Sequence, residues 1–424
     1  MKNILKFIVA SMLAILARAV IHRYPPHIVM VTGSVGKTST KDAVAAVLTT
    51  RFFVRKSDKS FNSEFGVPFT ILGVKNPWEN PLVWLSVIKS ALALLILPNH
   101  YPNMLVLEVG SGKPGDIAQI LKIVTPDAVM VTRLPEIPVH VETYASPESV
   151  REEEFSPALA LKNGAPLIIS VDDPYAMDRA LRISTRVISY GVSDGATVRV
   201  SESGFYEIDG KVIGMKANIV TDGKQKSLVV KGSVGMTQLL PATAALAAAI
   251  AFDIPPSEAF KAIESYEPPP GRGRLLQGKN GSIIIDDSYN ASPAAVEEAL
   301  TTLKNFPHAT RRIAVLGDML ELGRYSVMEH ERIGKLARDS ADLVAAVGIR
   351  ARAFISSHGT ADVLQYDNAK TAARELPDII QKGDVVLIKG SQSIRTERIV
   401  EALLANPSDS SLLVRQEREW KKKA

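Results

Sequence analysis

The stretch Val29-Met-Val-Thr-Gly-Ser-Val-Gly-Lys-Thr-Ser-Thr40 passes from an apolar run through two glycines into a polar segment that can continue as a helix. This order predicts a strand, a tight turn and a helix. Gly33 and Gly36 permit tight turning and close backbone approach, so peptide N–H groups and the start of the helix can face phosphate oxygens. The stretch therefore predicts a phosphate-binding loop in an α/β protein.

Four side chains of this loop are expected to serve a bound nucleotide, which we take to be ATP with Mg²⁺. Lys37 is expected to neutralise the β- and γ-phosphates, and the Thr38 hydroxyl to bind Mg²⁺. Ser34 and Ser39 stand beside them. Val31 occupies the position of the first glycine in the full Walker pattern, so the loop is a shortened form, and an ordinary strand-to-helix turn is the alternative.

Composition limits the classes to which the chain can belong. With 424 residues, 46% apolar and 22% charged, it is globular and long enough for two or three domains. Its 50 basic and 45 acidic residues leave a net charge of +5, too small and too dispersed to indicate a nucleic-acid partner. The lack of cysteine excludes disulfides, thiolate metal sites and cysteine nucleophiles. A cytoplasmic location is expected from the use of ATP.

Two apolar segments deserve comparison with membrane segments. The uncharged run Phe7–Ala17 is too short to span a bilayer, and no small-residue cleavage site follows it. We expect residues 1–26 to contain a helix that packs against the protein or lies on a membrane surface through residues 3–20, at the inner membrane face. The segment Pro81–Pro98 is interrupted by Lys89 and is expected to be a buried or interfacial helix.

The first half of the chain alternates short β-like runs with helical segments, which is typical of a parallel sheet covered by helices. Residues 193–230 then carry short alternating segments with Gly and Asp turns, which predict a small antiparallel insert, and an alanine-rich helix is expected at 239–252. We predict a central ATP-binding domain over residues 27–267. Its expected parallel strands are Ile28–Thr32, Met104–Val109, Ala128–Thr132 and Leu167–Val171.

The alternation restarts after Tyr266-Glu-Pro-Pro-Pro-Gly-Arg-Gly-Arg274, whose prolines forbid a helix and whose glycines permit a bend. The later pattern predicts a second, Rossmann-like domain over residues 268–424. Its expected strands are Ile283–Asp286, Ile313–Gly317, Leu343–Val347 and Val385–Lys389.

A further site residue is expected at the end of the apolar run Met104-Leu-Val-Leu-Glu108. An acid at the carboxyl end of a parallel strand lies at the sheet edge where α/β proteins bind ligands, and the phosphate loop lies at the same edge. Glu108 is therefore a candidate Mg²⁺ ligand. A solvated or salt-bridged glutamate at a strand end is the alternative.

These residues and several later motifs resemble the Mur ligase family over nearly the whole chain, from Ile28 to Leu404. Their number and order argue against a chance match. The segment Asn62-Ser-Glu-Phe-Gly-Val-Pro68 is similar to the family's Asn-Asn-x-Ile-Gly-x-Pro loop. The most specific pieces are Asp286-Asp-Ser-Tyr-Asn-Ala-Ser-Pro293, Leu316-Gly-Asp-Met-Leu-Glu-Leu-Gly323 with His330 following, and Lys389-Gly-Ser-Gln-Ser-Ile-Arg395.

The resemblance implies an ATP-dependent ligase that forms amide bonds. In such an enzyme a substrate carboxylate attacks the γ-phosphate, and an incoming amine displaces the resulting acyl phosphate. The motifs are most similar to those of ligases that add D-alanyl-D-alanine to a UDP-N-acetylmuramoyl tripeptide in peptidoglycan synthesis. Lys37, Thr38 and Glu108, with Mg²⁺, suit the charge neutralisation and in-line positioning that phosphoryl transfer requires.

The resemblance also assigns nucleotide contacts to the second domain. Asp286 and Asn290 are expected on the base and ribose side of ATP, with Arg272 or Arg274 assisting near the hinge. Closure of the two domains would exclude water from the acyl phosphate. The alternative for Asp286 and Asn290 is a structural role in capping the turn before Pro293.

The metal-binding residues follow the family less closely. Val139-His-Val-Glu-Thr-Tyr144 matches a motif whose histidine binds a second Mg²⁺, which makes His140 a candidate ligand, with a structural histidine as the alternative. Most members then carry a lysine whose carbamate serves the metal, where this chain has Arg151-Glu-Glu-Glu154. A glutamate can supply the same negative group. Alignment does not decide among Glu152, Glu153 and Glu154; Glu153 is taken as the candidate catalytic residue, and an acidic first turn of a helix is the alternative.

Two further departures affect the substrate. Gly235-Met-Thr-Gln-Leu-Leu-Pro-Ala242 lacks the histidine and the second amide that the family usually shows, so contacts made by those groups are in doubt. The phosphate loop also begins near residue 33, whereas the family's peptidoglycan ligases carry a UDP-sugar-binding domain before it. We therefore expect a partner that supplies a substrate-binding domain, or a different carboxylate.

Three readings of function remain open at this point. In the first, the enzyme acts on a nucleotide-linked cell-wall precursor. In the second, a Mur-like ligase or an amidase-coupled subunit acts on a different carboxylate, such as a lipid-linked precursor. In both, a dipeptide or an amino acid is the amine donor. The third reading is a non-catalytic nucleotide-binding scaffold. It is motivated by the glutamates at the position of the family lysine.

Overall fold

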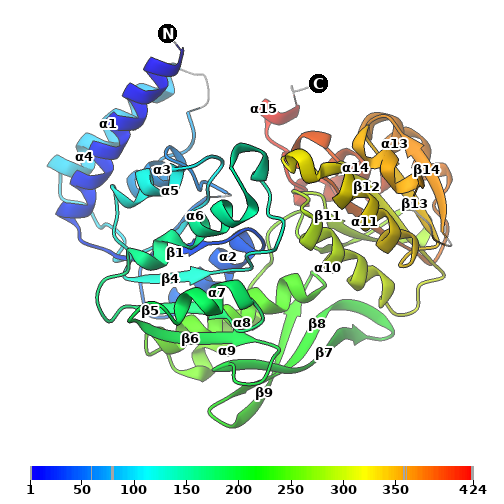
Figure 1. The fold of residues 1–424 in the computed structure, drawn as a ribbon, viewed down its shortest axis with the longest axis horizontal. Helices are drawn as coiled ribbons and strands as arrows, with labels where there is room; N and C mark the ends of the chain where they lie inside the picture. Colours follow the sequence, from blue (N-terminus) through cyan, green and yellow to red (C-terminus); the bar gives the residue numbers. More distant parts are fainter. Residues whose placement is uncertain (1, 59, 78–80, 357–358, 360, 422–424) are drawn as a thin grey trace.

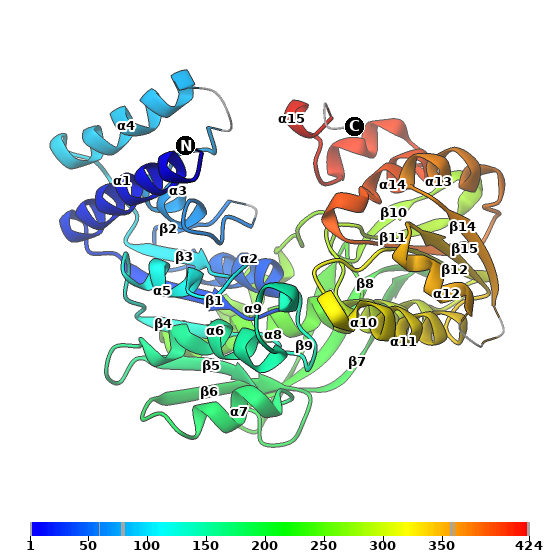
Figure 2. The ribbon, with the colours of Figure 1, turned by 45° about the horizontal axis from the view of Figure 1, so that its top comes forward.

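The computed structural model consists of two lobes, each built on its own β-sheet (Figure 1). It describes residues 2–58, 60–77, 81–356, 359 and 361–421, without the side chains of residues 2–7, 81–82 and 355–356. The larger lobe precedes β10, and the smaller lobe follows from β10 to the C-terminal helices (Figure 2). An α/β architecture with a phosphate-loop lobe followed by a Rossmann-like lobe is thereby confirmed.

A nine-stranded sheet organises the larger lobe, in the order β2-β3-β1-β4-β5-β6-β7-β8-β9. Strands β2 to β7 pair in parallel, and β7, β8 and β9 pair antiparallel. The parallel strands are short and buried on both faces, which explains their unbroken apolar runs. The strands are β1 His27–Thr32, β2 Val54–Lys56, β3 Met104–Glu108, β4 Ala128–Val131, β5 Pro166–Ser170, β6 Arg186–Gly191, β7 Val198–Ile208, β8 Lys211–Thr221 and β9 Lys224–Lys231.

Helices cover both faces of this sheet, because successive residues of a strand point to opposite sides. Val29 and Val31 of β1 belong to a core with α2, α8 and α9. Ile28 and Met30 belong to the opposite core, with α1 and α3 to α7. The helices are α1 Lys2–Arg23, α2 Lys37–Leu48, α3 Gly66–Leu72, α4 Pro81–Ile96, α5 Asp116–Leu121, α6 Pro147–Leu159, α7 Pro174–Ala180, α8 Met236–Ala251 and α9 Pro256–Glu264.

The smaller lobe contains a six-stranded sheet in the order β10-β11-β15-β12-β13-β14, parallel except for β10. The sequence motifs of this lobe lie at the ends of its strands, at the edge of the sheet that faces the larger lobe. The strands are β10 Arg274–Gln277, β11 Ile283–Asp287, β12 Arg311–Gly317, β13 Leu343–Val347, β14 Asp362–Tyr366 and β15 Asp384–Lys389. The helices are α10 Pro293–Lys304, α11 Ser326–Arg338, α12 Ala353–Ser356, α13 Ala369–Glu375, α14 Glu397–Leu403 and α15 Arg418–Lys421.

Helices α1 and α4 lie side by side at the outer edge of the larger lobe (Figures 1 and 2). The Arg23 guanidinium donates to the Leu95 carbonyl (2.7 Å), and the Tyr24 hydroxyl donates to the Leu94 carbonyl (2.8 Å). These bonds satisfy carbonyl groups at the end of α4, which otherwise lack partners in the helix. Among the described residues, no helix has both the length and the apolar character needed to cross a bilayer.

The structure revises two details of the sequence prediction. The strands within residues 193–230 are antiparallel as predicted, but they extend the main sheet beyond β6 instead of forming a separate insert, because Tyr190 and Gly191 pair with the start of β7. The N-terminal helix is longer than the apolar run Phe7–Ala17 and continues to Arg23. The predicted boundary between residues 267 and 268 falls in the connection from α9 to β10.

Candidate active site

The Gly33–Thr38 loop joins β1 to α2 in a conformation that requires glycine. Gly33 has a φ of +114°, and a β-carbon there would lie 2.3 Å from Thr132 Oγ1 and 3.0 Å from backbone atoms of Thr132. Gly36 has a φ of +89° and is the N-cap of α2. A side chain at either position is therefore strained, and at Gly33 it also collides with the end of β4.

The two halves of the loop have different hydrogen-bond partners. The N–H groups of Ser34 and Val35 donate to the Arg133 carbonyl at 3.0 and 3.3 Å, which fixes the first half to the sheet. The N-terminus of α2 has no side-chain cap. Its first-turn N–H groups, together with the helix dipole, are therefore available to an anion.

Lys37, the first residue of α2, folds back over the loop. Its Nζ contacts the Gly33 carbonyl oxygen and lies 3.6 Å from Glu154 Oε1, with 13% of the side chain exposed. Because the lysine side chain is flexible, its ammonium group can exchange the carbonyl and the carboxylate for phosphate oxygens. The position suits the charge neutralisation predicted for this lysine.

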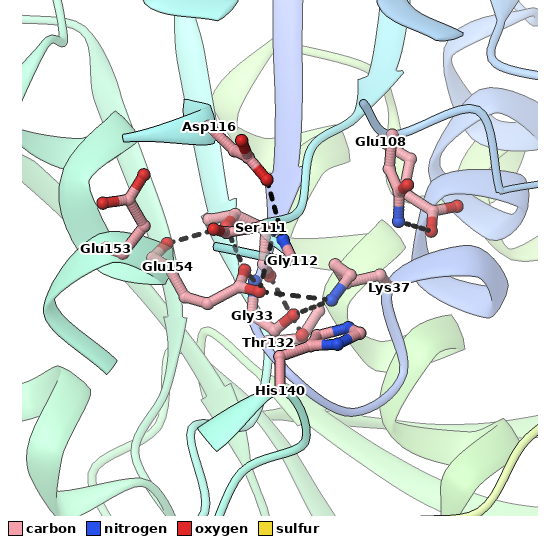
Figure 3. A network of polar contacts seen from close by, with 12 residues as sticks. Gly33, Lys37, Glu108, Ser111, Gly112, Asp116, Thr132, His140, Glu153 and Glu154 are labelled. Carbon is pink, nitrogen blue, oxygen red and sulfur yellow. Dashed lines mark hydrogen bonds and ion pairs between the residues drawn. The ribbon is translucent and has the colours of Figure 1, made fainter. Parts of the chain in front are cut away.

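Glu154 of α6 is the carboxylate that holds the loop (Figure 3). Its Oε2 accepts hydrogen bonds from the Gly33 N–H (3.0 Å) and the Thr32 hydroxyl (2.9 Å), and its residue is 2% exposed. The Ser111 N–H approaches Oε1 at 3.5 Å. This buried carboxylate thus binds the end of β1, the turn after it and Lys37 at once.

The two neighbouring glutamates point elsewhere. Glu153 points away from Lys37 (Figure 3) and accepts from the N–H groups of Gly115 (3.2 Å) and Ile117 (2.9 Å) at the start of α5. Glu152 is exposed and pairs with Arg179 at 3.2 Å. Of the three glutamates, Glu154 and not the candidate Glu153 lies at the phosphate loop, because successive helical side chains diverge by about 100°.

Glu108 ends β3 beside the loop and is 1% exposed. Its Oε2 lies 4.0 Å from Lys41 Nζ and has no hydrogen-bond partner among the described residues. Burial raises the pKa of this carboxyl, and the charges of Lys41 and Lys37 oppose that shift. A buried acid with one oxygen that accepts no hydrogen bond among the described residues, close to the Thr38 hydroxyl, fits a hard cation such as Mg²⁺.

No cluster of three or more His, Asp or Glu side chains that could hold a metal ion occurs in the part of the chain that the structure describes. Proteins usually bind Mg²⁺ through one or two carboxylates together with substrate phosphates. Thr38 and Glu108 are placed for that arrangement. His140 lines the same cavity as Thr38 and Glu108 (Figure 3).

His140 connects the two lobes. Its Nδ1 lies 2.8 Å from Glu321 Oε2, and the histidine holds the pKa of the Glu321 carboxyl below its usual range. Both residues have a φ of +66°, in the left-handed region that non-glycine residues seldom adopt. Strained backbone on both sides of a single contact indicates that the surrounding structure imposes this meeting of the lobes.

A second bridge between the lobes starts at Thr38. Arg272 Nη2 lies 3.4 Å from Thr38 Oγ1, and the Arg272 guanidinium stacks over the Tyr289 ring at 4.2 Å. The Tyr289 hydroxyl donates to Ser60 Oγ at 2.8 Å, and Ser60 Oγ lies 3.1 Å from Thr38 Oγ1. The connection between the lobes therefore contacts the predicted Mg²⁺ ligand through Arg272, and the smaller lobe reaches its neighbour Ser60 through Tyr289.

The bridge continues as alternating guanidinium groups and rings toward α15. Arg415 lies over Tyr289 (5.4 Å) and Trp420 (5.8 Å), and Arg395 lies over Trp420 at 5.5 Å. Buried Glu397 pairs with both arginines, at 2.5 Å from Arg395 and 2.9 Å from Arg415. This arrangement brings the indole of Trp420 to the wall of the site.

The Asp286–Asn290 motif divides between the site and the core. Asn290 lines the site, and its Oδ1 accepts from the Gln392 N–H at 3.3 Å. Asp286 is fully buried, accepts from Ser288, and has its pKa raised to about 6 by burial. Lys389 is buried and pairs with Asp287 at 2.6 Å; burial lowers its pKa against the effect of that carboxylate.

These groups surround a cleft of about 520 Å³ between the lobes. One wall comes from the phosphate loop and β3, and the other from the C-terminal motifs and α15. Such a cleft can hold a nucleotide with its phosphates at Lys37 and a second ligand between the lobes. The lining residues are Ser34, Gly36, Lys37, Thr38, Ser60, Asn62, Glu108, Val139, His140, Arg272, Tyr289, Asn290, Leu320, Glu321, Ser391, Gln392, Ser393 and Trp420.

Comparison with protein families gives two matches that together cover both lobes. The profile of the Mur ligase middle domain matches residues 31–249, and that of the Mur ligase glutamate ligase domain matches residues 271–392. The chain belongs to the Mur ligase family. The family suggested by the sequence motifs is thus confirmed.

Individual relatives are ligases of one kind. The UDP-N-acetylmuramoyl-tripeptide--D-alanyl-D-alanine ligase of Bacillus subtilis is 28% identical over 92% of this chain and 79% of the relative. The ligase of the same name from Mycobacterium tuberculosis is 28% identical over 91% of this chain and 74% of the relative. The crystal structure of MurF ligase from Thermotoga maritima in complex with ADP has a TM-score of 0.77 and 26% identity, covering 93% of this chain and 83% of that one.

The predicted site residues of this Mur ligase fall into two groups. Those that line the cleft are Ser34, Gly36, Lys37, Thr38, Glu108, His140, Arg272 and Asn290. Those placed outside its lining are Gly33, which supports the loop, and Ser39, Glu153, Arg274 and Asp286. Ser39 lies in the buried part of α2, and its carbonyl accepts from Tyr266. His330 is also structural, because its Nε2 accepts from the Met319 N–H at 3.0 Å.

Sequence reasoning missed several residues of the cleft. Tyr289 and Glu321 lie inside motifs that were recognised, but their side chains gain a role only through contacts with the other lobe. Ser60 precedes the recognised Asn62–Pro68 loop. Trp420 stands in a basic tail that carries no motif, and nothing in its neighbours indicates a site.

Proposed function

We propose that this Mur ligase forms an amide bond by activating a carboxylate with ATP, and that it adds D-alanyl-D-alanine to a UDP-N-acetylmuramoyl tripeptide in peptidoglycan synthesis. The observation that carries the proposal is the cleft that joins the phosphate loop to the C-terminal motifs. The names and coverage of the relatives support the choice of substrates. We assign nucleotide binding to residues 27–267 and closure of the site to residues 268–424.

The residues suit phosphoryl transfer followed by amide formation. A carboxylate oxygen of the acid substrate attacks the γ-phosphorus as ADP leaves, and the amine nitrogen then attacks the acyl carbon as phosphate leaves. Lys37 leaves Glu154 and neutralises the phosphates, while Glu154 keeps the Gly33 turn in place. Closure of the lobes through Arg272 and the contact between His140 and Glu321 limits hydrolysis of the acyl phosphate.

Thr38 and Glu108 would hold Mg²⁺, and His140 a second ion. The bound cation supplies charge stabilisation to the phosphates in this chemistry. Among the described residues no group donates a hydrogen bond to Oε2 of Glu108, which supports this assignment. The negative group that a carbamylated lysine gives other members is assigned to Glu154, which needs no bicarbonate.

Three parts of the proposal concern partners and location. We place the protein in the cytoplasm, at the inner membrane face, with residues 3–20 in contact with the membrane. The proposed partners are a nucleotide-linked cell-wall precursor and a dipeptide or amino acid as the amine donor. A lipid-linked carboxylate is the second candidate substrate, supported by the apolar surface of α1 and α4.

The test measures ADP release and product mass with purified protein. UDP-N-acetylmuramoyl tripeptide, a lipid-linked muramoyl peptide and unrelated acids are each combined with D-alanyl-D-alanine or single amino acids. The proposal expects ADP release and an adduct with the tripeptide and dipeptide, and no ADP release by the Lys37→Ala variant. Ligation of another acid, with every muramoyl peptide inert, would refute the substrate. A wild-type protein that binds nucleotide but forms no ADP with any pair of substrates would support the non-catalytic scaffold.

A further inference from the structure

Helices α1 and α4 lie at the outer edge of the larger lobe (Figure 2), and together they expose a set of large aliphatic side chains. An exposed apolar patch of this kind usually marks a surface that contacts a protein or a membrane. The side chains and their exposed fractions are Ile8 56%, Ile15 59%, Leu85 63%, Leu92 45%, Ile96 70% and, directly after α4, Leu97 57%.

The exposed side chains form a row on each helix. Ile8 and Ile15 are seven residues apart, and Leu85, Leu92 and Ile96 follow at intervals of seven and four, so each set lies on one helical face. The opposite faces are fully used in the core: Leu13, Ala17 and Val20 of α1, and Val87, Ala91 and Leu94 of α4, are buried. Each helix is thus apolar on two sides, which packing against this lobe alone does not require.

The charge of the two helices has a single sign. Their sequences contain Lys2, Lys6, Arg18, Arg23 and Lys89, and no aspartate or glutamate. Acidic and basic residues are nearly balanced over the whole chain, at 45 and 50. Arg18, Arg23 and Lys89 are exposed on the same helices as the aliphatic side chains, and this combination matches an anionic lipid surface, where the cations meet headgroups and the aliphatic groups enter the acyl boundary.

A groove of about 720 Å³ borders this surface between α1 and α5. Ile15 and Arg18 line it from α1, and Lys113 and Lys122 line it from the other side. Glu64 and Asp116 also line it, and the Asp116 carboxylate accepts from the N–H groups of Gly112 and Lys113. With three cations and two carboxylates beside the exposed Ile15, the lining has a net positive charge, which suits a lipid phosphate.

We infer that α1 and α4 form one docking surface for an anionic phospholipid bilayer. The bonds from Arg23 and Tyr24 to carbonyls at the end of α4 keep the helices together as a unit. One face of each helix is buried in the core of the lobe, so the pair meets the bilayer with its other face and lies in the interface. The inference adds α4 and a lipid charge preference to the contact proposed for residues 3–20, and it does not depend on the ligase reaction.

The test is flotation of the full chain with phosphatidylcholine vesicles, with and without one quarter phosphatidylglycerol. The wild-type protein is expected to float with anionic vesicles at least tenfold more than with neutral ones. The double variant Leu85→Glu/Leu92→Glu is expected to lose at least tenfold of that binding, and Arg18→Glu a smaller part. Leu181→Glu is the matched control, because Leu181 is 83% exposed at the end of α7, away from this surface.

Binding of ADP, measured for every variant, reports folding without any substrate. The inference is overturned if the wild type does not float with anionic vesicles, or if Leu85→Glu/Leu92→Glu floats as well as the wild type. It is also overturned if that variant instead converts a dimer into a monomer, which would assign the surface to a second copy of the chain. Failure of ligation in the substrate panel leaves these results unchanged.

Discussion

Replacement of Glu154 by glutamine is expected to destabilise the free protein more than its ADP complex. In the free protein Lys37 Nζ lies 3.6 Å from Glu154 Oε1, and the two side chains are 13% and 3% exposed. A glutamine oxygen can still accept from the Gly33 N–H and the Thr32 hydroxyl. Its amide NH₂ group then faces Lys37, so one buried charge loses its partner.

The magnitude follows from that loss. Removal of one partner from a buried ion pair costs about 3–5 kcal/mol. Lys37 retains the Gly33 carbonyl and some solvent, so a cost of about 2 kcal/mol is expected. At roughly 2–4 °C per kcal/mol for a lobe of this size, Tm should fall by about 4–8 °C. With ADP and Mg²⁺ bound, phosphate replaces the lost partner, and the difference from the wild type should shrink to less than about half.

Differential scanning fluorimetry with and without ADP and Mg²⁺ measures both quantities. Glu153→Gln is the matched control, because its carboxylate accepts only from N–H groups near the start of α5 and lies away from Lys37. The control should change Tm by less than about 2 °C and leave the ADP-induced increase at the wild-type value. The reasoning fails if Glu154→Gln has a wild-type Tm, or if the enlarged ADP response belongs to Glu153→Gln.

Gly33→Ala should lower Tm and abolish ADP binding, because a φ of +114° and the 2.3 Å approach to Thr132 together cost at least about 2 kcal/mol; titration calorimetry showing wild-type ADP affinity would contradict this. Glu321→Gln should reduce kcat/KM for ATP by roughly tenfold in an ADP-release assay, since it weakens the His140 contact between the lobes, and an unchanged value would show that closure does not need this pair. Burial raises the pKa of Asp286 to about 6, above its value in the unfolded chain, so ionisation of this carboxyl lowers the free energy of unfolding as pH rises from about 4 to about 6. Asp286→Asn should therefore be more stable than the wild type above pH 6, by up to about 3 kcal/mol, and should lose this advantage near about pH 4. Urea denaturation that gives the same difference between the two proteins at every pH would refute this prediction.

The sequence was sufficient for the parts of the fold that depend on local pattern. The strand before Gly33, the acid at the end of β3 and the restart of alternation after Arg274 all rest on runs of apolar residues and on glycine or proline between them. The sequence also predicted that Lys37 and Glu108 lie close together, because the carboxyl ends of neighbouring parallel strands meet at one edge of the sheet.

The parts that the sequence did not decide depend on which way a side chain points. Glu153 and Glu154 differ by one helical step, and only the packing of α6 beside β1 decides which faces Gly33. Asp286 and Asn290 belong to one motif, yet the end of β11 turns the first inward and leaves the second in the cleft. Trp420 reaches its place through two arginines and a buried glutamate, a set of tertiary contacts that no local pattern records.

The wall formed by Trp420 has a consequence for how the protein is made. Lys37 and Trp420 line one cleft although nearly the whole described chain separates them. During synthesis the larger lobe can begin to fold while the smaller lobe is still being translated, because each lobe has its own sheet and one core cluster confined to it. A third core cluster packs residues of both lobes together and is completed later. The nascent protein would then present its phosphate loop to cellular ATP long before the opposite wall exists. Productive closure must wait until residue 420 has left the ribosome, so a stalled or truncated chain would hold nucleotide without being able to shield an acyl phosphate.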